Sequence, residues 1–204
     1  MHFILMLLHL IGTPGLGAPT TSKQASENLG KVLSVSGNCT FDPSHKTISK
    51  DDRLSEGDRL SVMSKSKLKI WINEGKMLEI GPHSELYLKR NLQDQILLRI
   101  PHGSLFLVTT KNEEMEIRSS QIRILARNAN LHFHQELDKP ALIHVQKGSL
   151  KIIWPAGQAE ISANKKPQTF YIDRLKENLT PVSATEPIPE TMESLAKEAD
   201  SISP

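Results

Sequence analysis

The sequence has little cysteine, few aromatic side chains and no long apolar run. Its 204 residues contain one cysteine, Cys39, and only 4% aromatic residues. A single cysteine excludes an intramolecular disulfide, so the fold has to depend on a packed core and not on covalent cross-links. We interpret Cys39 as a small, semi-buried apolar side chain.

Signatures of catalysis are missing as well. The sequence contains no G-x-S-x-G nucleophile turn, no H-E-x-x-H zinc motif and no glycine-rich phosphate loop. We therefore expect a protein that is not an enzyme and that holds neither a cofactor nor a metal.

The formal net charge is only +2, and it is unevenly distributed. From Lys176 onward two lysines stand against six acidic residues, which gives −4, so the rest of the chain carries +6. This mildly basic body lacks the clustered Lys and Arg of a nucleic-acid footprint. We expect no nucleic-acid partner.

The longest apolar stretch, residues 3–11, is interrupted only by His9. A membrane-spanning helix needs about 20 apolar residues, so this stretch has the length of a signal-peptide core. We predict a signal peptide over residues 1–17 and a polar linker over 18–29. The mature protein is then periplasmic or secreted, with no stable membrane span. A buried strand or short helix at the N-terminus is the alternative.

The body of the chain, residues 30–172, is a succession of short alternating runs separated by turn signals. Residues 67–72, for example, alternate polar or aromatic with aliphatic side chains and end at the turn 73–75. The body lacks a long apolar stripe with the period of a helix. We predict an all-β fold, either a short irregular β-solenoid or a twisted two-layer β-sandwich.

An ordered set of turn motifs in this body resembles the FecR-like domain family. The motifs are Gly30-Lys-Val32, Leu54-Ser-Glu-Gly57-Asp58-Arg-Leu60, Ile80-Gly-Pro82-His-Ser84-Glu-Leu86, Val145-Gln-Lys-Gly148-Ser-Leu150 and Pro155-Ala-Gly157-Gln158. Together they extend over roughly residues 30–163. Their order, and the Gly81-Pro82-x-Ser84 element within them, make the set specific.

One turn departs from the family pattern. Members commonly carry an apolar residue followed by R-G-T-x-F, whereas this chain has Ala126-Arg-Asn128-Ala-Asn-Leu-His-Phe133. Asparagine tolerates a positive φ better than most residues. We therefore expect Asn128 to replace the missing glycine and to preserve the turn.

The resemblance also implies a biological role. The best-known family members are regulators in which a cytoplasmic segment controls a sigma factor, one helix crosses the membrane, and the periplasmic domain reads the state of an outer-membrane transporter. This sequence shows neither the cytoplasmic segment nor an apolar helix of about 20 residues. The resemblance then implies an exported sensing or binding module alone.

Our candidate binding residues are Trp71, Lys67 and Lys69. Strand alternation places them on the face opposite to the core positions Ile70 and Ile72. An exposed tryptophan among lysines is a suitable anchor for a partner, and the lysines would attract an anionic cell-wall glycan. The alternative is that Trp71 covers the edge of a thin core.

Two further segments carry interpretable patterns. His132-x-His134 puts two imidazoles on one strand face, which is either the edge of a metal site or simply a pair of polar surface side chains. Residues 173–204 form an acidic, proline-rich tail that we predict to be mostly disordered, with residues 191–199 as a short amphipathic helix.

Three functional hypotheses follow from the sequence. The first is an exported, non-catalytic FecR-like module that binds an envelope protein or a cell-wall glycan. The alternative is a structural scaffold of the envelope. The third, ranked lowest, is a metal-dependent enzyme that uses His132 and His134.

Overall fold

The computed structural model describes residues 28–72, 75–109, 114–137, 139–164, 166–173 and 178–181. Within these ranges 71% of the residues are in strands and none is in a helix, so the predicted all-β fold is confirmed. The described part of the chain accordingly offers no helix with the length and apolarity to span a bilayer. The predicted signal peptide and the predicted helix 191–199 lie outside the described residues.

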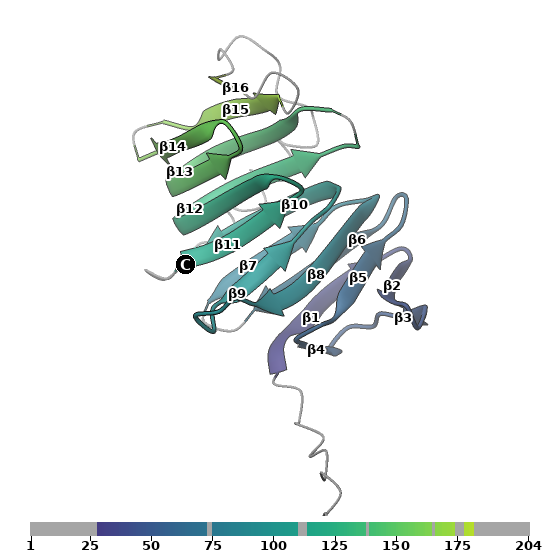
Figure 1. Cartoon of the computed structure of the whole chain (residues 1–204). Helices are drawn as coiled ribbons and strands as arrows, with labels where there is room; N and C mark the ends of the chain where they lie inside the picture. Colours follow the sequence, from purple (N-terminus) through teal and green to yellow (C-terminus); the bar gives the residue numbers. More distant parts are fainter. Residues whose placement is uncertain are drawn as a thin grey trace, which may run out of the picture.

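Sixteen described strands form one continuous sheet that curls on itself (Figure 1). The strands are β1 (Asn28–Ser36), β2 (Cys39–Asp42), β3 (Lys46–Thr47), β4 (Arg53–Ser55), β5 (Arg59–Val62), β6 (Lys67–Ile72), β7 (Lys76–Ile80), β8 (Ser84–Arg90), β9 (Ile96–Arg99), β10 (Gly103–Thr109), β11 (Glu114–Ser119), β12 (Ile122–Gln135), β13 (Ala141–Trp154), β14 (Gly157–Ser162), β15 (Gln168–Asp173) and β16 (Asn178–Pro181).

The curled sheet has two arms. In neighbour order, arm A is β4-β1-β6-β7-β10 and arm B is β3-β2-β5-β8-β9-β11, and both arms end on β12. Beyond β12, β13 pairs with both β14 and β15. Among the described pairs only β9 and β11 run parallel. The arrangement is therefore nearer to the predicted twisted two-layer sandwich than to a β-solenoid, whose coils pair in parallel.

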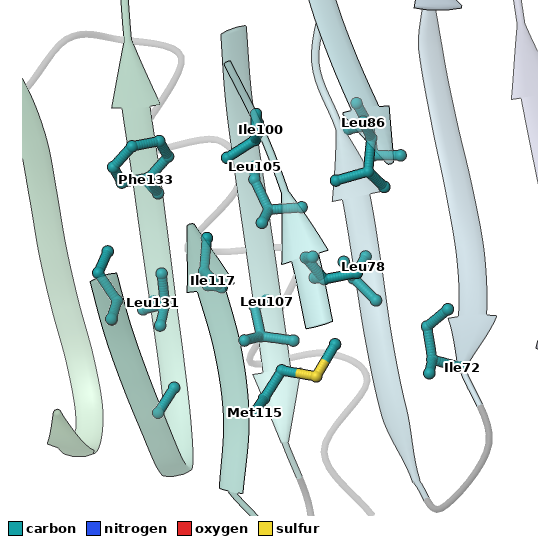
Figure 2. Close-up of a cluster of buried hydrophobic side chains, with 14 of the residues drawn as sticks. Ile72, Leu78, Leu86, Ile100, Leu105, Leu107, Met115, Ile117, Leu131 and Phe133 are labelled. Carbon is teal, nitrogen blue, oxygen red and sulfur yellow. The ribbon is translucent and has the colours of Figure 1, made fainter. Parts of the chain in front are cut away.

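The core lies between the two arms and is built from alternate residues of their strands. In β6, Leu68, Ile70 and Ile72 are fully buried, while the residues between them face outward. Figure 2 shows Leu107 of arm A and Ile117 of arm B in the same buried cluster. Burial of each such side chain stabilises the fold by about 1.5–3 kcal/mol, so this cluster holds the arms together.

One long strand, β12, joins the two arms, and the equally long β13 pairs along it. Residues 122–127 of β12 pair with β11 of arm B, and residues 130–135 pair with β10 of arm A. The register between β12 and β13 shifts on either side of Asn130. Strands that switch layers through a bulge or bend make the corners of β-sandwiches. The irregular segment of β12 therefore lets one sheet wrap around its own core.

The bend in β12 centres on Asn128, whose φ of 46° confirms the conformation predicted for this residue. Ala129 donates its backbone N–H to Thr109 Oγ1 at 2.7 Å, so the end of β10 holds the bend in place. Gly148 of β13 lies opposite with a φ of 95°, and a Cβ atom on it would be 2.1 Å from the Asn128 carbonyl oxygen. The close backbone approach requires glycine at this position.

Serine hydroxyls tie together the segments that cross between the arms. Ser84 accepts a hydrogen bond from the backbone N–H of Ser104 at 2.9 Å, and Ser66 accepts one from Asn38 at 2.8 Å. Both serines are buried. Loss of an acceptor in such a place leaves a polar group unpaired, which costs about 1–3 kcal/mol. The Gly81-Pro82-x-Ser84 element thus has a structural role at a crossover.

The strands extend beyond the predicted domain boundaries at both ends. β1 begins inside the predicted linker because Leu29 is fully buried in the core. β16 lies within the predicted tail, where it pairs with β15 and packs Leu179 partly against the core. Both ends are mostly polar, so a single buried leucine gave too weak a periodic signal to mark a strand.

Replacement of Gly148 by alanine tests the bend. We expect Gly148→Ala to lower the free energy of unfolding by about 2–4 kcal/mol, because the new Cβ adds a clash with backbone to the strain of a positive φ. Gly57→Ala is the matched control, since Gly57 has a φ of 90° and no atom within 4 Å of a built Cβ. It should cost about 1 kcal/mol. Urea denaturation measures both, and equal losses would contradict the role assigned to the bend.

Candidate binding surfaces

The outer face of arm A carries the three residues that the sequence singled out. Trp71 is 41% exposed and points away from the core, as the alternation in β6 predicted. Its cross-strand neighbours are Lys31 of β1 and Met77 of β7. The indole therefore lies on an open sheet face and does not close a core edge. Its role in binding stays a prediction.

The two lysines share one carboxylate. Lys67 Nζ lies 3.4 Å from Glu79 Oε1, and Lys69 Nζ lies 3.6 Å from Glu79 Oε2. Glu79 is buried on this outer face, whereas half of the Lys67 side chain is exposed. Glu79 thus holds both ammonium groups on the face that carries Trp71. The sequence predicted the lysines but not the acidic residue that orients them.

The same cross-strand row continues into a histidine cluster. From Glu79 the row passes to Phe106 in β10, His132 in β12, His144 in β13 and Thr169 in β15. Phe106 and His132 are 7% and 8% exposed although they face away from the core. His144 Nδ1 lies 2.8 Å from Thr169 Oγ1. This part of the outer face is therefore shielded from solvent, unlike the position of Trp71.

His132 is the most perturbed group on this face. Burial, followed by the neighbouring His134 and His144, lowers its pKa to about 4. Its Nδ1 is buried without a hydrogen-bond partner. The described ranges contain no group of three or more His, Cys, Asp or Glu side chains placed to hold a metal ion. The described ranges thus give the metal hypothesis no geometric support. With its pKa lowered to about 4, the imidazole of His132 is neutral at pH 7 in the folded protein.

The outer face of arm B carries a row of arginines that the sequence did not reveal. Direct cross-strand neighbours place five residues in line on five adjacent strands. We call this set the arginine row: Arg59, Tyr87, Arg99, Arg118 and Arg123. Alternation within each strand predicts that each of these side chains points outward. Only the register between adjacent strands shows that the five residues lie in one row.

At one end of the row, acidic side chains neutralise Arg59. Its guanidinium contacts Glu85 and lies 3.5 Å from Asp42. The ring of Tyr87 lies between two arginines, with Arg59 at 5.1 Å and Arg99 at 5.7 Å from its centroid. Both distances are within the range of a cation–π contact. Tyr87 therefore presents a covered ring.

At the other end, one buried carboxylate orients two arginines. Glu116 is 3% exposed and accepts hydrogen bonds from Arg118 Nε at 2.5 Å and from Arg123 Nε at 2.6 Å. Burial raises the pKa of Glu116, but the hydrogen bonds from Arg123, Arg118 and Asn91 outweigh it and hold the pKa below its usual value. The carboxylate stays ionised at neutral pH beneath the two guanidinium groups.

Cys39 belongs to neither surface. It is fully buried in the core, its Sγ lies 3.8 Å from the Lys67 carbonyl oxygen, and burial raises the pKa of its thiol. A buried thiol with a raised pKa forms little thiolate and reacts slowly. The interpretation as a small apolar side chain is confirmed, with deeper burial than the semi-buried position predicted.

The buried histidine gives the fold an acid sensitivity that titration can measure. Because the pKa of His132 falls from 6.5 to about 4 on folding, the unfolded chain binds more protons between these values. Stability should therefore fall as pH drops from about 6.5 to 4, by about 3 kcal/mol over the whole window for this group. His144, whose pKa burial also lowers, contributes in the same direction.

His132→Phe removes the titrating group and keeps a buried ring. We expect the variant to lose most of the stability change between pH 6.5 and 4 in urea denaturation. His45→Gln, at a histidine whose side chain is 82% exposed, is the control and should keep the wild-type slope. A His132→Phe profile as steep as that of the wild type would show that the acid sensitivity arises elsewhere.

Comparisons with known proteins show a similarity in fold to two solved structures. No family model matches the sequence, and a search of curated proteins finds no match. Two solved structures of candidate anti-sigma factors from Parabacteroides distasonis are similar in fold. The first has a TM-score of 0.56 and 13% sequence identity, and it covers 67% of this chain. The second has a TM-score of 0.53 and 12% sequence identity, and it covers 61% of this chain. The similarity extends over 64% and 59% of those chains, less than two thirds of their length.

Proposed function

We propose that the protein is a FecR-like sensing module, without catalytic activity, that binds a protein or glycan partner in the cell envelope. The observation that carries this proposal is Trp71, which is 41% exposed on the outer face of arm A near the end of β6, with two lysines on the same strand. In this proposal the partner docks on the outer face of arm A around Trp71, Lys67 and Lys69.

The fold and the turn motifs support the family part of the proposal. The two structures of similar fold are candidate anti-sigma factors, the class in which FecR-like domains occur. Residues of the motifs that resemble FecR lie at a crossover between the arms and at the bend in β12. Ser84 of the Gly-Pro-x-Ser element ties a crossover, and Asn128 and Gly148 form the bend between the arms.

The chemistry of the Trp71 surface supports the binding part. Tryptophan combines a large apolar area with one polar N–H, and exposed tryptophans are frequent among the residues that dominate binding energy. The lysines place two ammonium groups on the same face as Trp71, which favours approach of an anionic partner. Glu79 limits the freedom of both lysines, so less side-chain entropy is lost when a partner binds.

Export belongs to the same proposal. A sensing module of this kind meets its partner outside the cytoplasm, and the apolar residues 3–11 have the length expected of a signal-peptide core. Cleavage before Ala18 would leave the described strands intact, since β1 begins at Asn28. Mass spectrometry of the exported protein would identify the mature N-terminus.

Affinity capture from an envelope fraction tests the binding surface. The tagged wild-type protein should retain one or more proteins or glycans, and Trp71→Ala with Lys69→Ala should lose about tenfold or more of that material, which corresponds to 1.4 kcal/mol. Quantitative mass spectrometry and carbohydrate analysis measure the retained partner.

Tyr171→Ala is the matched control. Tyr171 is an aromatic side chain with 39% exposure, similar to Trp71, but it lies on β15, away from β6. We expect this variant to capture the same material as the wild type. An equal loss in both variants, or capture that is independent of Trp71, would argue against the proposed surface.

A further inference from the structure

We propose that the arginine row on arm B is a second docking surface, and that it binds an acidic, extended peptide segment of a partner protein. This inference rests on the proposed function, because it names a chemistry for the partner of a binding module. It uses a different face of the molecule from the Trp71 surface, so the two can be tested independently.

The charge of the row is the first argument. Arg99 is the cross-strand neighbour of Arg118, which in turn is the neighbour of Arg123. Like charges directly opposite each other destabilise a sheet. The only carboxylate bound to these three residues in the described structure is that of Glu116. Three guanidinium groups and one carboxylate leave two positive charges, which a bound anion would offset.

The orientation of the donors is the second argument. Glu116 takes the Nε–H groups of Arg118 and Arg123, together with one terminal nitrogen of Arg123. Arg99 has no ion pair with a described residue, and its guanidinium lies over Tyr87. The remaining terminal N–H groups are available to a ligand, while 41–49% of the Arg118 and Arg123 side chains is exposed. A buried carboxylate that fixes two guanidinium planes pre-organises them for carboxylate ligands.

The geometry favours a peptide. Adjacent strands lie about 4.8 Å apart, so the three arginines span roughly 10 Å across the sheet. In an extended peptide, alternate side chains on one face are about 6.8 Å apart, which lets two acidic residues reach this span. A guanidinium fork binds a carboxylate with two parallel hydrogen bonds.

Tyr87 argues against a ligand that has to stack on an aromatic ring. Two guanidinium groups lie over its ring, at 5.1 Å and 5.7 Å from the centroid. Nucleobases are held in single-strand binding sites by stacking on open aromatic rings. The surface therefore presents hydrogen-bond donors and not a stacking platform.

Fluorescence anisotropy tests the inference on the full chain. The probe is a fluorescein-labelled peptide that alternates glutamate and serine, compared with the same peptide in which glutamine replaces glutamate. We expect the acidic peptide alone to bind at low salt and to dissociate as salt screens the charges. Arg99→Gln with Arg118→Gln should weaken binding about tenfold or more.

The matched control removes two positive charges elsewhere. Lys147→Gln with Lys166→Gln alters exposed lysines outside both surfaces and should change the affinity less than about twofold. Arg118→Lys keeps the charge but loses the planar fork, so it should weaken binding by a smaller factor than the glutamine variant. Circular dichroism confirms that each variant is folded.

Four outcomes would overturn the inference. The first is that the acidic peptide does not bind, and the second is that the lysine control loses as much peptide affinity as the arginine variant. The third is that polygalacturonate binds more tightly than the peptide. The fourth is that the peptide binds more tightly after Glu186, Glu190 and Glu193 are changed to glutamine. The third would identify a glycan surface, and the fourth would show that the acidic end of this chain occupies the row. Envelope capture that depends on Trp71 would survive any of them, so failure here leaves the proposed function standing.

Discussion

The bend by which β12 passes from one arm to the other is the constraint on which the rest of the structure depends. It needs Asn128 at positive φ, a backbone approach that only Gly148 permits, and the Thr109 hydroxyl as acceptor for Ala129. The bend turns the sheet back on itself, so that the apolar faces of the two arms pack against each other. With it, one sheet encloses a single core, and both arms are fixed relative to each other.

Wrapping one sheet around its core also decides what faces the solvent. Most of the described strands bury alternate residues, as β6 does, so each arm has one inner and one outer face. Side chains on an outer face are free to serve recognition. The two outer faces differ in chemistry. Arm A presents Trp71 with lysines held by Glu79, whereas arm B presents guanidinium groups held by Glu116. In both cases a buried carboxylate orients two cationic side chains, which limits the entropy lost on binding.

The similarity in fold to candidate anti-sigma factors agrees with this division between scaffold and surface. At 12–13% identity the similarity is one of fold alone. The motifs common to the FecR-like pattern and this chain, such as Ser84 and Gly148, serve crossovers and the bend. The residues that we propose for recognition lie between those motifs, on strand faces that folding leaves open to change.

The sequence by itself determined most of the strands, the outward direction of Trp71 and the conformation of Asn128, because alternation and turn chemistry are local properties of the chain. Only the tertiary structure decided which strands are neighbours. Arg99 and Arg118 become adjacent through the parallel pairing of β9 with β11, and Phe106 buries His132 from another strand. Such contacts depend on register between distant segments, and alternation within one strand carries no information about the strand beside it.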